Sequence, residues 1–381
     1  MATTRKTRIV LISDTHNQTP KLPPGDILIH AGDLTNQGSY SELERTVEWL
    51  EKSDFEAKVV VAGNHDTTLS PPFFHSSANK WKWPSPQDPA ACRQLLLSSP
   101  SITYLEHEAA TIYLPRRKTT LRVFGSPYTP GQRGWAFQYW GDEEAEKIWG
   151  RAEGMDGVNV VVTHGPAFGY VDETEGDGGR AGCRVLARRV KETRPLIHVC
   201  GHIHAGRGVE RVRWRDTEED DGVEKWVDPG LGNKKLSLLD LTGKTGRKIE
   251  NEGNIGERHI VDGKLKDLFE GQPAAQPQSG EGRKQASSLV GCALNEAEVG
   301  MHVWRRKSGG AIECRRHGEV GRSEVDVDGH GDGKGVEGRN ETAMINAAFL
   351  GPRAGNNKAY TFNKPIVVDV ELPVWEFDGG S

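Results

Sequence analysis

The sequence predicts an α/β fold that contains a partly parallel sheet. Short apolar, β-branched runs recur through the first half of the chain, and each ends in Gly, Ser, Asp or His. Segments with helical period lie between several of these runs. Strands that alternate with helices indicate layered α/β structure. At 381 residues, the chain is long enough to bury a substantial core.

Six apolar runs in the first half are expected to form strands. They are residues 8–13 (RIVLIS), 26–30 (DILIH), 57–63 (AKVVVAG), 121–126 (LRVFGS), 158–164 (VNVVVTH) and 196–202 (LIHVCGH). A helix is predicted over 41–52, where Ser39 and Glu42 resemble a capping box before an apolar face. A second helix is predicted over 183–193, with Pro195 just beyond its end.

The character of the chain changes from about residue 242 to 340. This segment is rich in Gly, Glu, Lys, Arg and Ser and has no apolar period, so we expect a disordered or loosely ordered insertion. Apolar runs return at 342–351 and 363–373 and are expected to complete the core. The prediction is one domain over residues 1–373, interrupted at about 242–340, and a short tail at 374–381.

Composition limits the classes of partner and compartment. A net charge of -5 does not favour nucleic acid, because proteins that bind it carry a dominant basic face. The five cysteines are scattered without a C-x-x-C pair, which indicates reduced thiols. The first residues contain no apolar signal region, and no run approaches the roughly 18 apolar residues of a membrane span. We expect a cytoplasmic protein with no membrane partner.

Polar side chains follow the predicted strands where each strand ends. In an α/β sheet, such positions converge at one edge even when they are far apart in sequence. Two carboxylates, four imidazoles and one amide oxygen suit a pair of borderline transition metals when one carboxylate bridges them. The seven candidate ligands are Asp14 and His16 (SDTH), Asp33 (GD), Asn64 (GNHD), His164 (THG), and His202 and His204 (GHIH).

The seven candidates divide between two metals. The first would take Asp14, His16, Asp33 and His204, and the second would take Asp33, Asn64, His164 and His202. Each motif alone has a structural alternative: SDTH is often a helix cap or turn, and a lone THG is often a buried, hydrogen-bonded histidine. GHIH alone is evenly balanced between a metal site and a structural pair. Five such motifs that each close a strand favour the metal site.

This series of D-x-H, GD, GNHD, GH and GHxH resembles the calcineurin-like metallophosphoesterase superfamily. The flanking segments 125–138, 163–172, 182–195 and 200–210 are similar to the metallophosphoesterase-domain-containing group and its fungal relatives. The resemblance covers roughly residues 8–240 and resumes at 342–373. It implies a four-layer α/β/β/α sandwich, a dinuclear site of Mn, Fe or Zn, and hydrolysis of phosphoesters, with cyclic nucleotides among the substrates of the closer group.

The expected reaction is in-line attack on phosphorus by a hydroxide that bridges the metals. His65 would protonate the leaving alkoxide, and Asp66 would orient the other ring nitrogen of His65. The second motif reads GDLTNQG where protein phosphatases of the superfamily have GDxVDRG, so a phosphodiesterase is expected in preference to a protein phosphatase. The alternative is a catalytically weak metal- or nucleotide-binding scaffold, and a nuclease ranks third.

The expected partner is a small phosphoester substrate, with nucleotides as one candidate class. A loop flanked by Gly and Pro carries three residues that could contact it: Gln132, Arg133 and Trp135. An ordinary loop with a buried aromatic residue is the alternative. Arg180 and Arg207 lie near ligand motifs in sequence and are candidate phosphate contacts.

Overall fold

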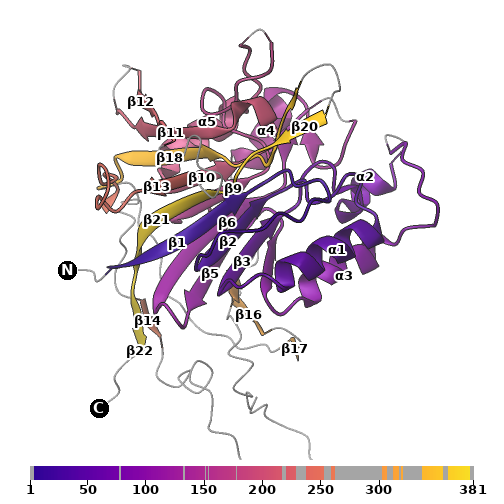
Figure 1. The fold of residues 1–381 in the computed structure, drawn as a ribbon, viewed down its shortest axis with the longest axis horizontal. Helices are drawn as coiled ribbons and strands as arrows, with labels where there is room; N and C mark the ends of the chain where they lie inside the picture. The colour runs from indigo at the N-terminus through magenta and orange to yellow at the C-terminus, as the bar shows by residue number, and fades with distance from the viewer. Residues whose placement is uncertain are drawn as a thin grey trace, which may run out of the picture.

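The computed structural model describes residues 4–76, 79–131, 134–150, 152, 154–176, 178–216, 220–228, 237–252, 259–261, 303–306, 312–316, 319–320, 337–354 and 359–377. Most of the described chain forms two mixed sheets with helices on their outer faces (Figure 1). None of the helices in these ranges has the length and apolar character needed to cross a lipid bilayer.

The first sheet has six strands and is mainly parallel. Its order is β13 (Ser237–Asp240), β21 (Ile366–Pro373), β1 (Thr4–Ile12), β2 (Ile27–Ala31), β3 (Ala57–Val61) and β4 (Ile102–Leu105). Strands β1 to β4 run parallel, whereas β21 pairs antiparallel to β1. The predicted strands at 8–13, 26–30 and 57–63 therefore lie side by side.

The second sheet has ten described strands. Its order is β12 (Gly222–Lys225), β11 (Gly208–Arg213), β18 (Glu341–Asn346), β10 (Ile197–Cys200), β9 (Val160–Thr163), β6 (Thr119–Ser126), β5 (Glu108–Leu114), β15 (Val303–Arg306), β16 (Ile312–Arg316) and β17 (Glu319–Val320). Strands β6, β9, β10 and β18 are parallel neighbours. Three short pairs complete the strands: β7 (Thr129–Pro130) with β8 (Gln138–Tyr139), β14 (His259–Val261) with β22 (Trp375–Phe377), and β19 (Leu350–Ala354) with β20 (Ala359–Phe362).

Three apolar clusters define four layers. Alternate side chains of β1 show this, because Ile9 and Leu11 pack between the two sheets while Val10 and Ile12 pack toward the helices. Helices α1 (Tyr40–Glu51) and α3 (Pro89–Ser98) cover the first sheet. Helices α4 (Gly141–Trp149) and α5 (Arg184–Thr193) cover the second. The α/β/β/α sandwich that the resemblance implied is therefore confirmed.

Short helical segments lie in the connections. They are η1 (Thr67–Leu69), α2 (Pro71–Phe74) and η2 (His204–Gly206). The predicted capping box is present at the start of α1, where Glu42 accepts a hydrogen bond from the Ser39 backbone N–H. The predicted second helix also forms and ends at Arg194 in a left-handed conformation, one residue before Pro195.

The polar segment expected at about 242–340 is described only in part. Residues 242–252 are part of the domain, since Ile249 and Asn251 are buried there. Strands β14 (His259–Val261), β15, β16 and β17 fall within 242–340, and the expectation of a disordered or loosely ordered insertion stays a prediction. Pairing supplied by β22 and β5 allows these strands to form where local pattern does not. The rest of the predicted insertion lies outside the described residues.

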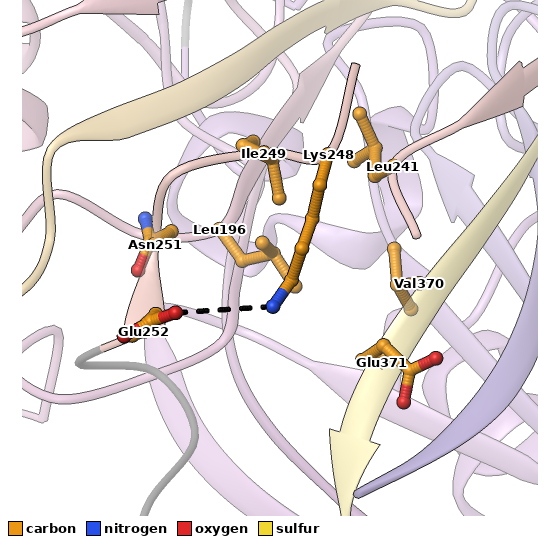
Figure 2. Close-up of a pocket in the computed structure, with 8 residues that line it drawn as sticks. All are labelled: Leu196, Leu241, Lys248, Ile249, Asn251, Glu252, Val370 and Glu371. Atoms are coloured by element: carbon orange, nitrogen blue, oxygen red, sulfur yellow. Dashed lines mark ion pairs between the residues drawn. The ribbon is translucent and has the colours of Figure 1, made fainter. Parts of the chain in front are cut away.

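A pocket lies near the beginning of β10 and the end of β21 (Figure 2). Its wall includes Leu196, which precedes β10, and Val370, in the part of β21 that pairs with the beginning of β1. Lys248 and Glu252 form an ion pair of 3.9 Å at its rim. The pocket is therefore separate from the strand ends that carry the predicted metal ligands.

Candidate metal centre

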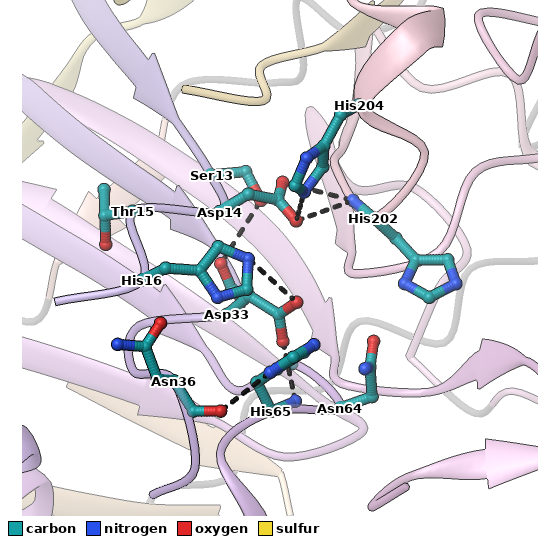
Figure 3. Close-up of polar contacts among 12 residues, drawn as sticks. Ser13, Asp14, Thr15, His16, Asp33, Asn36, Asn64, His65, His202 and His204 are labelled. Carbon is teal, nitrogen blue, oxygen red and sulfur yellow. Dashed lines mark hydrogen bonds and ion pairs between the residues drawn. The ribbon is translucent and has the colours of Figure 1, made fainter. Parts of the chain in front are cut away.

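The strand ends bring all seven predicted ligands together. Asp14 and His16 follow β1, Asp33 follows β2, and Asn64 follows β3 in the first sheet. His164 follows β9, and His202 and His204 follow β10 in the second sheet. Figure 3 shows the side chains from both sheets converging at one edge of the sandwich. This is the edge formed by the carboxyl ends of the parallel strands.

The loops that carry the ligands have strained backbones. Asp14, His16, Asp33 and His202 all have positive φ, between 43° and 66°. Non-glycine residues rarely adopt this region, and such strain concentrates at functional sites. Backbone hydrogen bonds hold the strained loops against each other, from Asp14 N to Gly32 O at 2.9 Å and from His16 N to Asp33 O at 3.1 Å. The left-handed backbone at Asp14, His16 and Asp33 therefore orients the side chains after β1 and β2 toward a common centre.

The first group of candidate ligands surrounds Asp14. One ligand atom from each of Asp14, His16 and His204 lies within 4.8 Å of the others. The Oδ1 atom of Asp14 is 3.3 Å from Nε2 of His204. Burial raises the pKa of Asp14, but the hydrogen bond and charge of His204 outweigh burial and lower that pKa to about 2. Asp14 is therefore a carboxylate at neutral pH and can bind a cation.

Asp33 lies between the two groups and faces both of them. Its Oδ2 atom is 3.6 Å from Nε2 of His16, and its Oδ1 atom is 3.4 Å from Nε2 of His164. Burial raises the pKa of Asp33, but the neighbouring histidines, His164 first, hold it well below its ordinary value. A carboxylate that directs one oxygen to each side fits a bridging ligand between two metal ions.

The second group contains Asp33, His164 and His202, whose ligand atoms also lie within 4.8 Å of one another. Nδ1 of His164 donates to the Ala31 carbonyl at 2.9 Å. This bond leaves Nε2 toward Asp33 and toward Oδ1 of Asn64, which is 2.9 Å away. Burial lowers the pKa of His202 to about 4, so that its imidazole is neutral and able to bind a metal. The donor set thus fits a second cation.

Electrostatics favour positive charge at this centre. Burial lowers the pKa of His164, but the charge and hydrogen bond of Asp33 outweigh it and raise that pKa to about 9. Two buried carboxylates with surrounding imidazole and amide acceptors form a set that a divalent cation would neutralise. The division predicted from sequence adds Asp33 to the first group and Asn64 to the second. Their role as metal ligands stays a prediction.

The predicted contact between Asp66 and the His65 ring is wrong. Nδ1 of His65 donates instead to the backbone carbonyl of Asn36, at 2.8 Å. The Asp66 carboxylate is fully buried and accepts hydrogen bonds from Gly63, Leu34 and Thr35. The Asp66 carboxylate therefore points toward the backbone of Gly63 and Leu34 and not toward the His65 ring. Sequence reasoning missed Asn36 because a backbone carbonyl leaves no signal in residue type.

His65 also lies close to the first group. Its ring is 4.7 Å from that of His16 in an edge-on arrangement, and its ligand atom lies within 4.8 Å of those of His16 and Asp33. On its other side the ring contacts Trp135, with centroids 4.0 Å apart, and Trp135 contacts Trp81 at 4.9 Å. A row of aromatic rings thus leads from the centre to Trp81, which is exposed at the surface.

Two buried histidines support the ligand loops. Nε2 of His30 is 2.9 Å from the Thr15 hydroxyl, and Nε2 of His198 is 2.8 Å from the Thr163 hydroxyl. Burial lowers the pKa of each to about 3, so both rings are neutral. Both side chains are fully buried, between the sheet core and the loops that follow β1 and β9.

The other sequence candidates are engaged elsewhere or are not described. Arg180 pairs with Asp172 at 2.6 Å, and Arg207 donates to the Lys364 carbonyl at 2.7 Å. Both arginines therefore make structural contacts. Gln132 and Arg133 lie outside the described residues.

Comparisons with known proteins identify the family of the chain. A family model described as "Calcineurin-like phosphoesterase" matches residues 7–206, which is more than half of the chain. The human "Metallophosphoesterase domain-containing protein 1" is 34% identical over 216 residues, which cover 53% of this chain and 62% of that protein. "Probable rhamnogalacturonate lyase C" of Emericella nidulans is 40% identical over 226 residues, which cover 58% of this chain and 20% of that protein.

The chain therefore spans only part of these relatives, a fifth of the lyase-named protein and about three fifths of the human one. Among solved structures, a purple acid phosphatase from yellow lupin matches with a TM-score of 0.31 and 11% identity, covering 90% of this chain and 54% of that one. Residues 7–206, which the family model matches, include the strand ends that hold all seven candidate ligands. The chain belongs to the calcineurin-like phosphoesterase family.

Proposed function

We propose that this protein is a phosphodiesterase that uses two transition metal ions. The observation that carries the proposal is the position of Asp33, whose two oxygens face separate groups of ligands. Asp14, His16, Asp33 and His204 would hold one ion, and Asp33, Asn64, His164 and His202 the other. Imidazole, carboxylate and amide donors suit Mn, Fe or Zn. Two such ions, when bound, lower the pKa of water and polarise a phosphoryl oxygen.

The residues of the chain position the substrate and move the proton. His65 borders the first ligand group, and its Nδ1–H bond to Asn36 leaves Nε2 as the atom that exchanges a proton with substrate. We propose that Nε2 protonates the oxygen that leaves phosphorus. Alcohols leave poorly without a proton, and a placed general acid contributes roughly 10²–10⁴-fold to the rate.

The aromatic row supports a substrate that carries an aromatic group. Trp135 packs on His65, and Trp81 extends the row to the surface. Such rings can stack on a planar base, which is worth about 1–3 kcal/mol for each stacked base. We therefore propose a nucleotide, with cyclic nucleotides as the first class to test, and no nucleic-acid or membrane partner.

Two further features complete the proposal. The GDLTNQG motif lacks the arginine of the protein phosphatases, so a small phosphodiester is proposed in preference to a phosphoprotein. Cys92, Cys183 and Cys200 are free and buried among the described residues, which agrees with a proposed cytoplasmic location.

Substitution of the bridging residue tests the function. We expect Asp33→Asn to lower the content of bound manganese and to reduce hydrolysis of bis-p-nitrophenyl phosphate by about 10²-fold or more, since one carboxylate serves both ions. Metal analysis and turnover are measured on the same protein. Asp54→Asn, at an exposed position whose side chain is 98% accessible, is the matched control.

The outcomes separate an enzyme from a scaffold. If wild type binds manganese through Asp33 but hydrolyses none of a panel of cyclic nucleotides, phosphodiesters and phosphomonoesters, the protein is a metal-binding scaffold. If Asp33→Asn keeps the wild-type metal content, the proposed centre is wrong.

A further inference from the structure

We propose that Asp66 and Thr35 are positioning residues that hold the carbonyl of Asn36 against His65. This inference rests on the proposed function, because it assigns a device that prepares His65 to protonate the leaving group. Asp66 directly follows His65 in the chain, yet its carboxylate does not contact the His65 ring. It binds the backbone of Leu34 and Thr35, in the loop that carries the Asn36 carbonyl. The device consists of the loop 34–38 and the segment 63–68.

A hydrogen bond between His65 and Asn36 fixes the histidine ring. A carbonyl oxygen only accepts hydrogen bonds, so Nδ1 of His65 carries the hydrogen in this 2.8 Å contact. The contact fixes both the orientation of the ring and the identity of the other nitrogen. Figure 3 shows this bond beside the ligands around Asp33 and His16. Displacement of the Asn36 carbonyl would free the ring to rotate and to exchange its tautomer.

The Asp66 carboxylate holds the beginning of loop 34–38. Oδ1 of Asp66 accepts from the backbone N–H of Thr35 at 2.9 Å and from its hydroxyl at 2.7 Å. Oδ2 accepts from the N–H groups of Leu34 at 3.1 Å and Gly63 at 2.8 Å. Each oxygen receives two donors, so only a carboxylate satisfies the arrangement. An amide at this position would direct its own N–H groups at donors.

Two threonine hydroxyls hold the end of the same loop. The Thr67 hydroxyl donates to the Gln37 carbonyl at 2.6 Å, and the Thr68 hydroxyl donates to the Gly38 carbonyl at 2.5 Å. The N–H of Gly38 donates to the Thr35 hydroxyl at 2.8 Å, which closes the loop on itself. Hydrogen bonds therefore fix the residues on both sides of Asn36, and this fixes the orientation of its carbonyl.

The chemistry gives this device a measurable signature. In the proposed step, water oxygen forms the new bond to phosphorus and the bond to the leaving oxygen breaks. That oxygen takes the proton from Nε2 of His65, and the proton lost by water passes to solvent. An acidic phenol such as p-nitrophenol leaves well without this proton, whereas a weakly acidic phenol or an alcohol does not. Loss of positioning should therefore slow only substrates with poor leaving groups.

The kinetic experiment uses the metal-loaded, full-length protein and a series of aryl methyl phosphates. We expect Thr35→Val to retain wild-type metal content and turnover of the p-nitrophenyl ester within about twofold, yet to lose about tenfold or more on the phenyl ester. Asp66→Asn should show the same pattern. Thr67→Val keeps the test open if Asp66→Asn does not fold. Thr120→Val is the matched control, because the Thr120 hydroxyl is buried without a hydrogen-bond partner in the described structure.

A second readout does not depend on activity. Long-range proton–nitrogen NMR spectra of the histidine rings, with His65 assigned by His65→Gln, should show the Nδ1–H form in wild type and a mixture of forms in Thr35→Val. An equal loss on both esters, or an unchanged ring spectrum in Thr35→Val, would overturn the inference. If wild type hydrolyses no ester but its ring spectrum responds as expected, the proposed function fails and the positioning contact stands.

Discussion

At the scale of single residues, the close approach of glycine Cα atoms shapes the centre. Gly32 has a φ of +100°, and a Cβ atom there would lie 2.5 Å from Nδ1 of His164 and 2.7 Å from the Ala62 carbonyl. Both the conformation and the contact exclude a side chain. The glycine of the GD motif therefore gives His164 the space in which it reaches the Ala31 carbonyl.

We predict that Gly32→Ala weakens metal binding at the second group by about tenfold or more, because His164 must move away from its carbonyl partner. Left-handed strain adds a loss of stability of about 1–3 kcal/mol. Manganese titration and thermal unfolding measure the two effects. The control is Gly169→Ala, where φ is +93° and no atom of the described residues lies within 4 Å of the added Cβ. Equal loss of metal affinity in both variants would contradict the argument from contact.

At the scale of elements, β21 is the strand that links the end of the chain to its beginning. Its Asp369 accepts from Nε of Arg8 at 2.7 Å and from Nη2 at 2.9 Å, and it pairs with Lys6 at 2.6 Å. All three residues belong to the antiparallel pairing of β1 and β21. Burial raises the pKa of Asp369, but the hydrogen bonds from Arg8 and Lys6 outweigh it and lower that pKa below its ordinary value.

A depressed carboxyl pKa stabilises the fold at pH values above the pKa of the unfolded chain, and this contribution is lost as pH falls through the folded value. We predict that Asp369→Asn lowers the free energy of unfolding by about 1 kcal/mol at pH 7, a value limited by the partial exposure of Arg8 and Lys6. The difference from wild type should shrink below about pH 4. Urea unfolding at both pH values tests this, and a difference that grows in acid would show that the sign is wrong.

At the scale of the whole molecule, the two sides of the long polar segment meet in the core. Asn251 bridges to Arg339, and the N–H of Asn340 donates to the Glu250 carbonyl at 3.1 Å. The candidate ligands lie at the other end of the sheets. The segment between these residues can therefore change length at a modest entropic cost, since closure entropy grows slowly with loop length.

We predict that replacement of residues 254–336 by a short Gly-Ser linker leaves manganese content and phosphodiester hydrolysis within about twofold of wild type. Thermal stability should fall, because the change removes β15 from the edge of β5 and β14 from β22. Metal analysis, turnover and thermal unfolding of the two proteins test this. A variant that stays folded but loses its metal would tie the segment to the centre.

Local sequence pattern was enough to predict the fold class, the strands that end in polar residues and the seven candidate ligands. These follow from local periodicity and from the chemistry of each residue type. Two features are visible only in the folded chain. Asp33 directs one oxygen to His16 and the other to His164, and Asn36 rather than Asp66 contacts the His65 ring. The physical reason is that these contacts depend on how separate loops are placed by strand register, and a backbone carbonyl contributes through position and not through residue type.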